Sequence, residues 1–144
     1  ARIFHEFVYE GGVTDVWTAV SEVLAKRRGV CQDFAHLEIA ALRSLGLPAR
    51  YMSGYLLTHP AEGKERMVGA DASHAWISVW CPDFGWVEFD PTNNLMPSDE
   101  HIALAWGRDY GDVSPTTGII VGGGAHTVSV GVSVESASQQ ELRS

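Results

Sequence analysis

One cysteine of this chain occupies a position where a thiol can act as a nucleophile. Cys31 follows Gly29 and Val30 and opens a helical pattern that continues to about Leu45. A thiol at the start of a helix faces the positive end of the helix dipole, which favours the nucleophilic thiolate. Most free cysteines are small buried apolar residues, so the position alone leaves both interpretations open.

A histidine and an aspartate lie on two short β-runs that a turn connects. The runs cover residues 73–81 and 85–90, with a Pro-Asp-Phe turn signal between them. Because strand side chains alternate, Asp90 is expected directly across from His74 or one diagonal step away. Either residue alone has an ordinary structural explanation, such as a turn aspartate before a proline. Together they supply a base and the carboxylate that orients it, so we predict a catalytic triad with Cys31.

Helical patterns come first in the chain and strand patterns follow. Thr18 is the expected N-cap of a first helix, Gly29 its expected end, and a second, mostly buried helix starts near Cys31. Strands are expected at residues 3–8, 50–57, 73–81, 85–90, 101–106, 118–121 and 126–134, with loops at 59–70 and 110–124. Helices followed by an antiparallel sheet indicate an α+β domain.

Composition limits the classes of function. The 144 residues suit one domain, for which we expect a folded core at 1–135 and a polar, flexible tail at 136–144. A net charge of −8 argues against nucleic acid and anionic membrane surfaces as partners, and no apolar run has the length of a membrane span. Two cysteines are too few for a disulfide-stapled secreted scaffold. We expect a cytoplasmic fragment of a longer protein, whose oligomeric state the sequence leaves open.

No metal and no organic cofactor is predicted. The histidines and cysteines lack a close C-x-x-C or H-x-x-x-H spacing. The glycines at 122–124 lack the strand–loop–helix context of a phosphate loop. Cys81 lies on the strand face opposite His74 and is expected to pack. Trp76 and Trp80 share the face of His74 and are expected to line a cleft between helix and sheet.

Several motifs resemble those of bacterial transglutaminase-like proteins, over about residues 7–135. They are RGVCQDFAHL (28–37), LGLPARYMSGY (45–55), SHAW (73–76), WVEFDPT (86–92), WGRDY (106–110) and GGGAH (122–126). The resemblance implies a papain-related fold, in which the helix of the nucleophile packs on an antiparallel sheet that carries the histidine and the aspartate. It also implies acyl transfer through a thioester, without a cofactor, and a β-rich segment before this core.

Two classes of function follow from this resemblance. The first is an enzyme acting on a protein or peptide substrate, either as an amidase or peptidase or as a glutamine–amine transferase. The second is a non-catalytic peptide-binding module that keeps the fold; the intact set of Cys31, His74 and Asp90 favours the enzyme. The Cys31 backbone N–H can serve as one oxyanion donor. The second donor is left unassigned, with Trp17 interpreted as core packing and Tyr9 as the weaker alternative.

Overall fold

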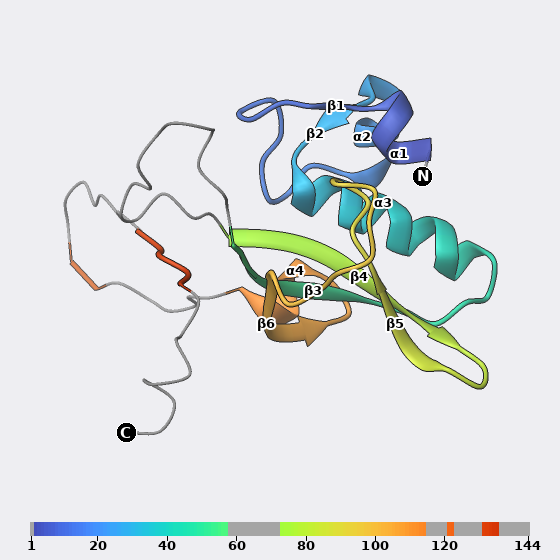
Figure 1. Cartoon of the computed structure of the whole chain (residues 1–144). Coiled ribbons are helices and arrows are strands. Elements are labelled where there is room, and N and C mark those ends of the chain that lie inside the picture. The colour runs from blue at the N-terminus through green and yellow to red at the C-terminus, as the bar shows by residue number, and fades with distance from the viewer. Residues whose placement is uncertain (1, 58–72, 115–120, 123–130, 136–144) are drawn as a thin grey trace, which may run out of the picture.

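The computed structural model describes residues 2–57, 73–114, 121–122 and 131–135. Its elements in chain order are α1 (Arg2–Glu6), β1 (Val8–Tyr9), α2 (Val20–Lys26), β2 (Arg28–Gly29), α3 (Cys31–Ser44), β3 (Ala49–Leu56), β4 (Ser73–Cys81), β5 (Gly85–Phe89), β6 (His101–Gly107) and α4 (Tyr110–Val113). The long helix α3 lies along one face of a sheet, and the small N-terminal elements pack on the other side of α3 (Figure 1).

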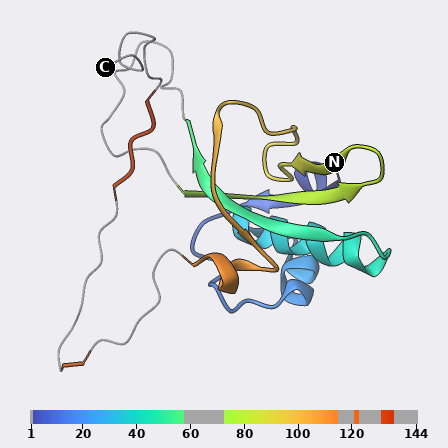
Figure 2. The same cartoon turned by 90° about the horizontal axis from the view of Figure 1, so that it is seen from below.

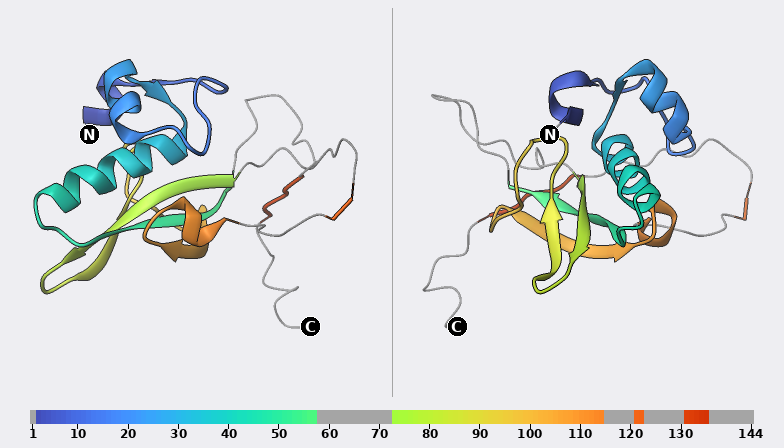
Figure 3. Two further views of the ribbon diagram at one scale, coloured as in Figure 1. Left: turned by 180° about the vertical axis from the view of Figure 1, so that it is seen from behind. Right: turned by 90° about the vertical axis from the view of Figure 1, so that its right-hand side faces the viewer.

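The sheet is antiparallel and has the strand order β5-β4-β3-β6. The β4–β5 hairpin pairs Ile77 with Phe89 and Cys81 with Gly85, so its turn lies at 82–84 as predicted. The strands twist along the sheet, as two further orientations show (Figures 2 and 3). Antiparallel pairing in the hairpin, with Phe89 opposite Ile77, brings the end of β5 toward the start of β4.

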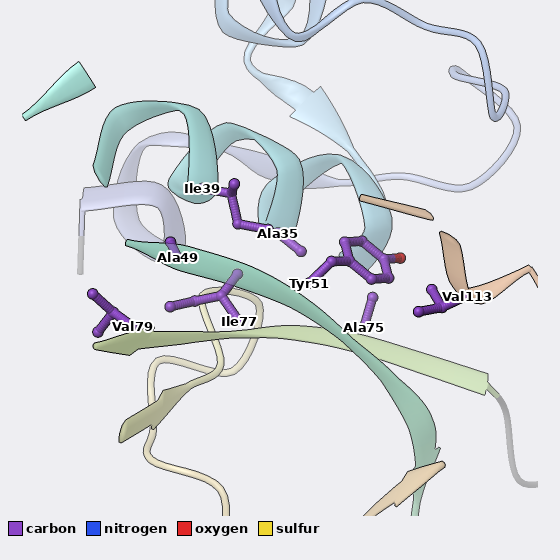
Figure 4. Packing of buried hydrophobic residues seen from close by; sticks show 8 residues of the cluster. All are labelled: Ala35, Ile39, Ala49, Tyr51, Ala75, Ile77, Val79 and Val113. Carbon is purple, nitrogen blue, oxygen red and sulfur yellow. The ribbon is translucent and has the colours of Figure 1, made fainter. Parts of the chain in front are cut away.

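The core lies between α3 and the two central strands. Its buried residues come from the helix, from β3, from β4 and from the short helix α4: Ala35, Ile39, Ala49, Tyr51, Ala75, Ile77, Val79 and Val113 (Figure 4). Ala35 is completely buried, and a side chain this small lets the helix approach the sheet closely. The observed architecture confirms the predicted α+β class, with a helix packed on an antiparallel sheet.

Helix α2, which was predicted to start after Thr18 and to end at Gly29, differs from its prediction at both ends. It covers Val20–Lys26 only, and its C-cap is Arg27, which adopts the left-handed conformation with φ 53°. Thr18 does not cap it. Instead the Thr18 hydroxyl accepts a hydrogen bond from the backbone N–H of Asp15 at 2.9 Å and closes a local turn. A hydroxyl just before a helix can accept a hydrogen bond either from an N–H of the helix or from an N–H of the preceding turn. The sequence pattern does not distinguish these two arrangements.

Gly29 was predicted to end that helix, but it belongs to β2, which pairs in parallel with β1. A Cβ placed on Gly29 would lie 2.6 Å from a carboxylate oxygen of Asp33. The glycine is therefore required because a side chain of α3 packs directly against the backbone here.

Other predictions differ from the structure or lie outside its described residues. The strand expected at 3–8 is mostly helical, because α1 covers Arg2–Glu6. The loop expected at 110–124 begins with α4, whose N-cap Asp109 accepts a hydrogen bond from the Gly111 N–H at 2.9 Å. The loop at 59–70, the tail at 136–144 and most of the strands expected at 118–121 and 126–134 lie outside the described residues. No helix in the described part of the chain is long and apolar enough to span a membrane.

Candidate active site

Cys31 is the first residue of α3, as the sequence predicts. A buried carboxylate fixes the turn that precedes it: Asp33 accepts hydrogen bonds on Oδ2 from the Val30 N–H at 2.8 Å and from the Thr14 hydroxyl at 2.7 Å. An acidic side chain at the third helical position also favours the positive end of the helix dipole. Sequence reasoning missed this role of Asp33, although its spacing from Val30 was a usable signal.

The β4–β5 hairpin brings His74 and Asp90 into contact. Its register pairs Ile77 with Phe89, so the next step along β5 sets Asp90 one diagonal step from His74. His74 Nε2 lies 2.7 Å from Asp90 Oδ2. The two residues are only 9% and 1% exposed, so water screens this interaction weakly.

Both oxygens of Asp90 accept several hydrogen bonds. Oδ1 accepts from the backbone N–H groups of Thr92 at 2.9 Å and Asn93 at 3.1 Å. Oδ2 accepts from the Asn93 amide at 2.8 Å and from His101 Nε2 at 3.1 Å, besides His74. Burial alone would raise the pKa of Asp90, but hydrogen bonds and charge, mainly from His74, hold that pKa well below its ordinary value. Asp90 is therefore ionised at neutral pH.

His74 interacts with Cys31 as well as with Asp90. Burial alone would lower the pKa of His74, but hydrogen bonds and charge from Asp90 and Cys31 outweigh it and raise the pKa to about 9. Because Nε2 faces Asp90, Nδ1 is the nitrogen left for the thiol. Trp76 stacks on the imidazole with ring centroids 6.0 Å apart and an interplanar angle of 23°. The structure thus brings the three predicted residues into one cluster, in which the raised pKa of His74 favours its imidazolium form at neutral pH.

Tyr9 also reaches Cys31. Its backbone pairs with Gly29 in the β1–β2 ladder, which brings its phenol close enough to Cys31 for that side chain to raise the Tyr9 pKa. Burial raises the pKa of Tyr9 and the charge of Cys31 raises it further, so the hydroxyl stays protonated and can donate. Trp17, by contrast, is 87% exposed, so the core packing expected for it is wrong. Its ring lines an open hollow of about 720 Å³ next to His36.

The remaining predicted residues lie around this cluster. Trp76 is fully buried beside His74, whereas Trp80 is half exposed and packs edge-on against Trp86 at 5.7 Å. Cys81 is partly buried at the margin of the core, as expected of a packing residue. A small hollow of about 230 Å³ lies between Glu38 of α3 and the segment that follows β5, and Asp90 lines it.

His74, Asp90 and His101 each place one nitrogen or oxygen atom within 4.8 Å of the others, a spacing that could hold a metal ion. Both histidines, however, direct Nε2 at the same carboxylate oxygen, at 2.7 and 3.1 Å. These are hydrogen-bond distances, and the protons between the atoms occupy the space that a metal with bonds of about 2.0–2.1 Å would need. We therefore interpret the three side chains as a hydrogen-bond network.

Comparisons with known proteins find relatives of this chain. An uncharacterized protein of Mycobacterium tuberculosis is 50% identical over 139 residues, which cover 94% of this chain and 44% of that protein. A protein-glutamine gamma-glutamyltransferase of Pseudomonas aeruginosa is 37% identical over 73 residues, 49% of this chain and 11% of that enzyme. The chain thus spans less than half the length of these curated relatives.

A solved structure has the same fold. The crystal structure of a candidate cysteine protease from Cytophaga hutchinsonii superimposes with a TM-score of 0.65 and 33% sequence identity, covering 78% of this chain and 35% of that one. The pattern of the transglutaminase-like superfamily matches residues 2–91, which include the nucleophile helix and the His–Asp hairpin. This chain therefore belongs to the transglutaminase-like superfamily, a family of cysteine-dependent acyl transfer.

Proposed function

We propose that this domain transfers acyl groups from carboxamide or peptide bonds through a thioester on Cys31. The observation that supports the proposal most is the buried His74 between Cys31 and Asp90, with a pKa raised to about 9. At neutral pH this imidazolium stabilises a thiolate beside it and carries the proton that a leaving amine needs.

The proposed reaction has two halves. In the first, the Cys31 sulfur attacks the carbonyl carbon, His74 Nδ1 gives its proton to the departing nitrogen, and the C–N bond breaks to leave a thioester. In the second, neutral His74 takes a proton from water or from a primary amine, which attacks the thioester and releases Cys31 as a thiolate. Water yields a free acid and an amine yields a new amide, so the same site supports hydrolysis and transfer.

Asp90 keeps the imidazole in the tautomer that this reaction requires. Its Oδ2, 2.7 Å from His74 Nε2, accepts a hydrogen bond from the N–H at that nitrogen and leaves Nδ1 to exchange protons with the thiol and the substrate. The hydrogen bonds of Thr92 and Asn93 fix the orientation of the carboxylate itself.

The oxyanion formed on attack needs two hydrogen-bond donors. The Cys31 backbone N–H is one candidate, because the first N–H groups of a helix have no acceptor within that helix. We assign the second role to the Tyr9 hydroxyl, because Cys31 lies close enough to raise the pKa of Tyr9 and the phenol is protonated at neutral pH, so it can donate.

The proposal is tested by incubating the full-length protein that contains this domain with glutamine-containing peptides, with and without a primary amine. Release of ammonia with free acid indicates hydrolysis of the side-chain amide, peptide fragments indicate peptidase activity, and amine incorporation indicates transfer. A folded Cys31→Ala variant is the control and should give none of these products. Peptide binding by wild-type protein without any product would instead support a binding module.

A further inference from the structure

A second histidine contacts the carboxylate of the candidate triad, and no step above uses it. His101 opens β6, its side chain is 3% exposed, and its Nε2 lies 3.1 Å from Asp90 Oδ2. Its ring packs edge-on against Trp76 at 5.3 Å and against His74 at 5.8 Å. Two imidazoles thus share one carboxylate oxygen in a buried site.

The hydrogen bonds of His101 define its form. A carboxylate oxygen only accepts, so Nε2 carries the proton that it donates to Asp90. Nδ1 is buried and has no hydrogen-bond partner among the described residues. His101 thus gives Asp90 one hydrogen bond, through Nε2.

We propose that His101 is a positioning residue. It shares Asp90 Oδ2 with His74 and thereby limits how tightly the carboxylate holds the His74 imidazolium. Each hydrogen bond that a carboxylate oxygen accepts reduces the negative charge available to its other donors. This matters because His74 must give up its proton in the first half of the proposed reaction and act as a base in the second. The effect of His101 on catalysis rests on the proposed function, whereas the sharing of Asp90 Oδ2 by the two histidines does not.

Among the residues that the structure describes, few ionisable groups can transmit this effect. Asp90 and His74 contact His101 directly, and Cys31 lies beyond His74. Glu88 lies beyond Trp76, whose indole N–H donates to its carboxylate at 2.6 Å. A change at His101 therefore reaches the triad through Asp90 and His74.

The test is an NMR titration of the His74 ring nitrogens in the full-length protein. His101→Phe keeps a ring in place against Trp76 but removes the hydrogen bond to Asp90. The titration midpoint of His74 should then move to higher pH, by about half a unit or more. His101→Gln, whose amide can donate to the same oxygen, should return the midpoint toward its wild-type value. Leu104→Ala, at an exposed position of the same strand, is the control and should not move it.

An unchanged or lower midpoint in His101→Phe would overturn the inference, and so would equal shifts in the Phe and Gln variants. If His101→Phe is too unstable to titrate, His101→Gln is compared with wild type instead. The His74 midpoint should then stay close to its wild-type value. An upward shift as large as half a unit would contradict the sharing of Asp90 Oδ2. If the wild-type protein shows no turnover but the His74 midpoint still rises in His101→Phe, the proposed function is refuted and the sharing of Asp90 by the two histidines stands. In an active protein, His101→Phe should slow thioester formation, because a more tightly held His74 proton is a poorer donor to the leaving nitrogen.

Discussion

Asp90→Asn separates the charge of the buried pair from its shape. The rise in the pKa of His74 from 6.5 to about 9 corresponds to roughly 3 kcal/mol of imidazolium stabilisation. Asp90 supplies a large share of it through a hydrogen bond and its charge, opposed by burial. Asparagine keeps the volume but not the charge, so the pKa of His74 should fall and turnover should drop by orders of magnitude, about 10⁴-fold where an aspartate of this role has been replaced.

The substitution should also cost stability at neutral pH. One amide orientation sets the NH₂ group against the donors His74, His101 and Asn93; the other sets it against the backbone N–H groups of Thr92 and Asn93. Neither orientation satisfies all the donors, so we expect a loss of about 1–3 kcal/mol in the free energy of unfolding.

The pH dependence of stability then tests the charge itself. Because the pKa of His74 is raised in the folded state, its contribution is complete below pH 6.5 and is lost as the pH rises through about 9. The depressed pKa of Asp90 acts in the other direction, giving stability above pH 3.8 that is lost as the pH falls further. Wild type should therefore lose stability between pH 6.5 and 9, and Asp90→Asn should lose less.

Urea unfolding of both proteins at pH 6.5 and pH 9 measures this difference, since groups unaffected by the substitution cancel in the comparison. Asp83→Asn is a matched control: it removes the same charge in the β4–β5 turn, where φ is 71° and asparagine is well tolerated. It should keep the wild-type dependence on pH. An equal loss of stability in wild type and Asp90→Asn would show that Asp90 does not stabilise the His74 imidazolium.

Three further predictions concern the nucleophile and its surroundings. A limiting dose of iodoacetamide at neutral pH should modify Cys31 well before Cys81, because only Cys31 lies at a helix start beside an imidazolium; peptide mapping that finds equal labelling would count against the assignment. Gly29→Ala should lower the free energy of unfolding by about 1–3 kcal/mol in urea titrations, because its Cβ meets a buried carboxylate at 2.6 Å, whereas Gly11→Ala, with open space around it, should not. Tyr9→Phe should keep the fold and lower kcat by about 10²-fold if the hydroxyl stabilises the oxyanion, and an unchanged kcat would leave Tyr9 with packing alone.

The sequence predicted the helix and the hairpin of this site because both depend on local patterns. The apolar helix that starts at Cys31 and ends before Pro48 has clear signals at each end, and α3 covers Cys31–Ser44. The turn at 82–84 sets the pairing of β4 with β5, and that register is enough to bring Asp90 within one diagonal step of His74.

The N-terminal elements could not be predicted in the same way, because contacts distant in sequence determine them. Glycine commonly ends helices, yet the role of Gly29 is set by Asp33, which packs against it from α3. The exposure of Trp17 likewise contradicts a rule that holds for most large apolar residues, since position in the fold decides burial.

The contact between His101 and Asp90 depends on a feature that alternation along a strand does not reveal. β6 follows β5 in the chain but pairs with β3, and the β3–β6 register shifts between Ser53 and Gly54. A Cβ on Gly54 would lie 1.9 Å from the carbonyl oxygen of Ile102 and 2.9 Å from the Trp76 ring. Gly54 is therefore what allows the start of β6 to approach the strand pair that carries the histidine. A glycine within an aromatic strand pattern predicts close approach of some other group, and here that group is the backbone that positions the second imidazole on Asp90.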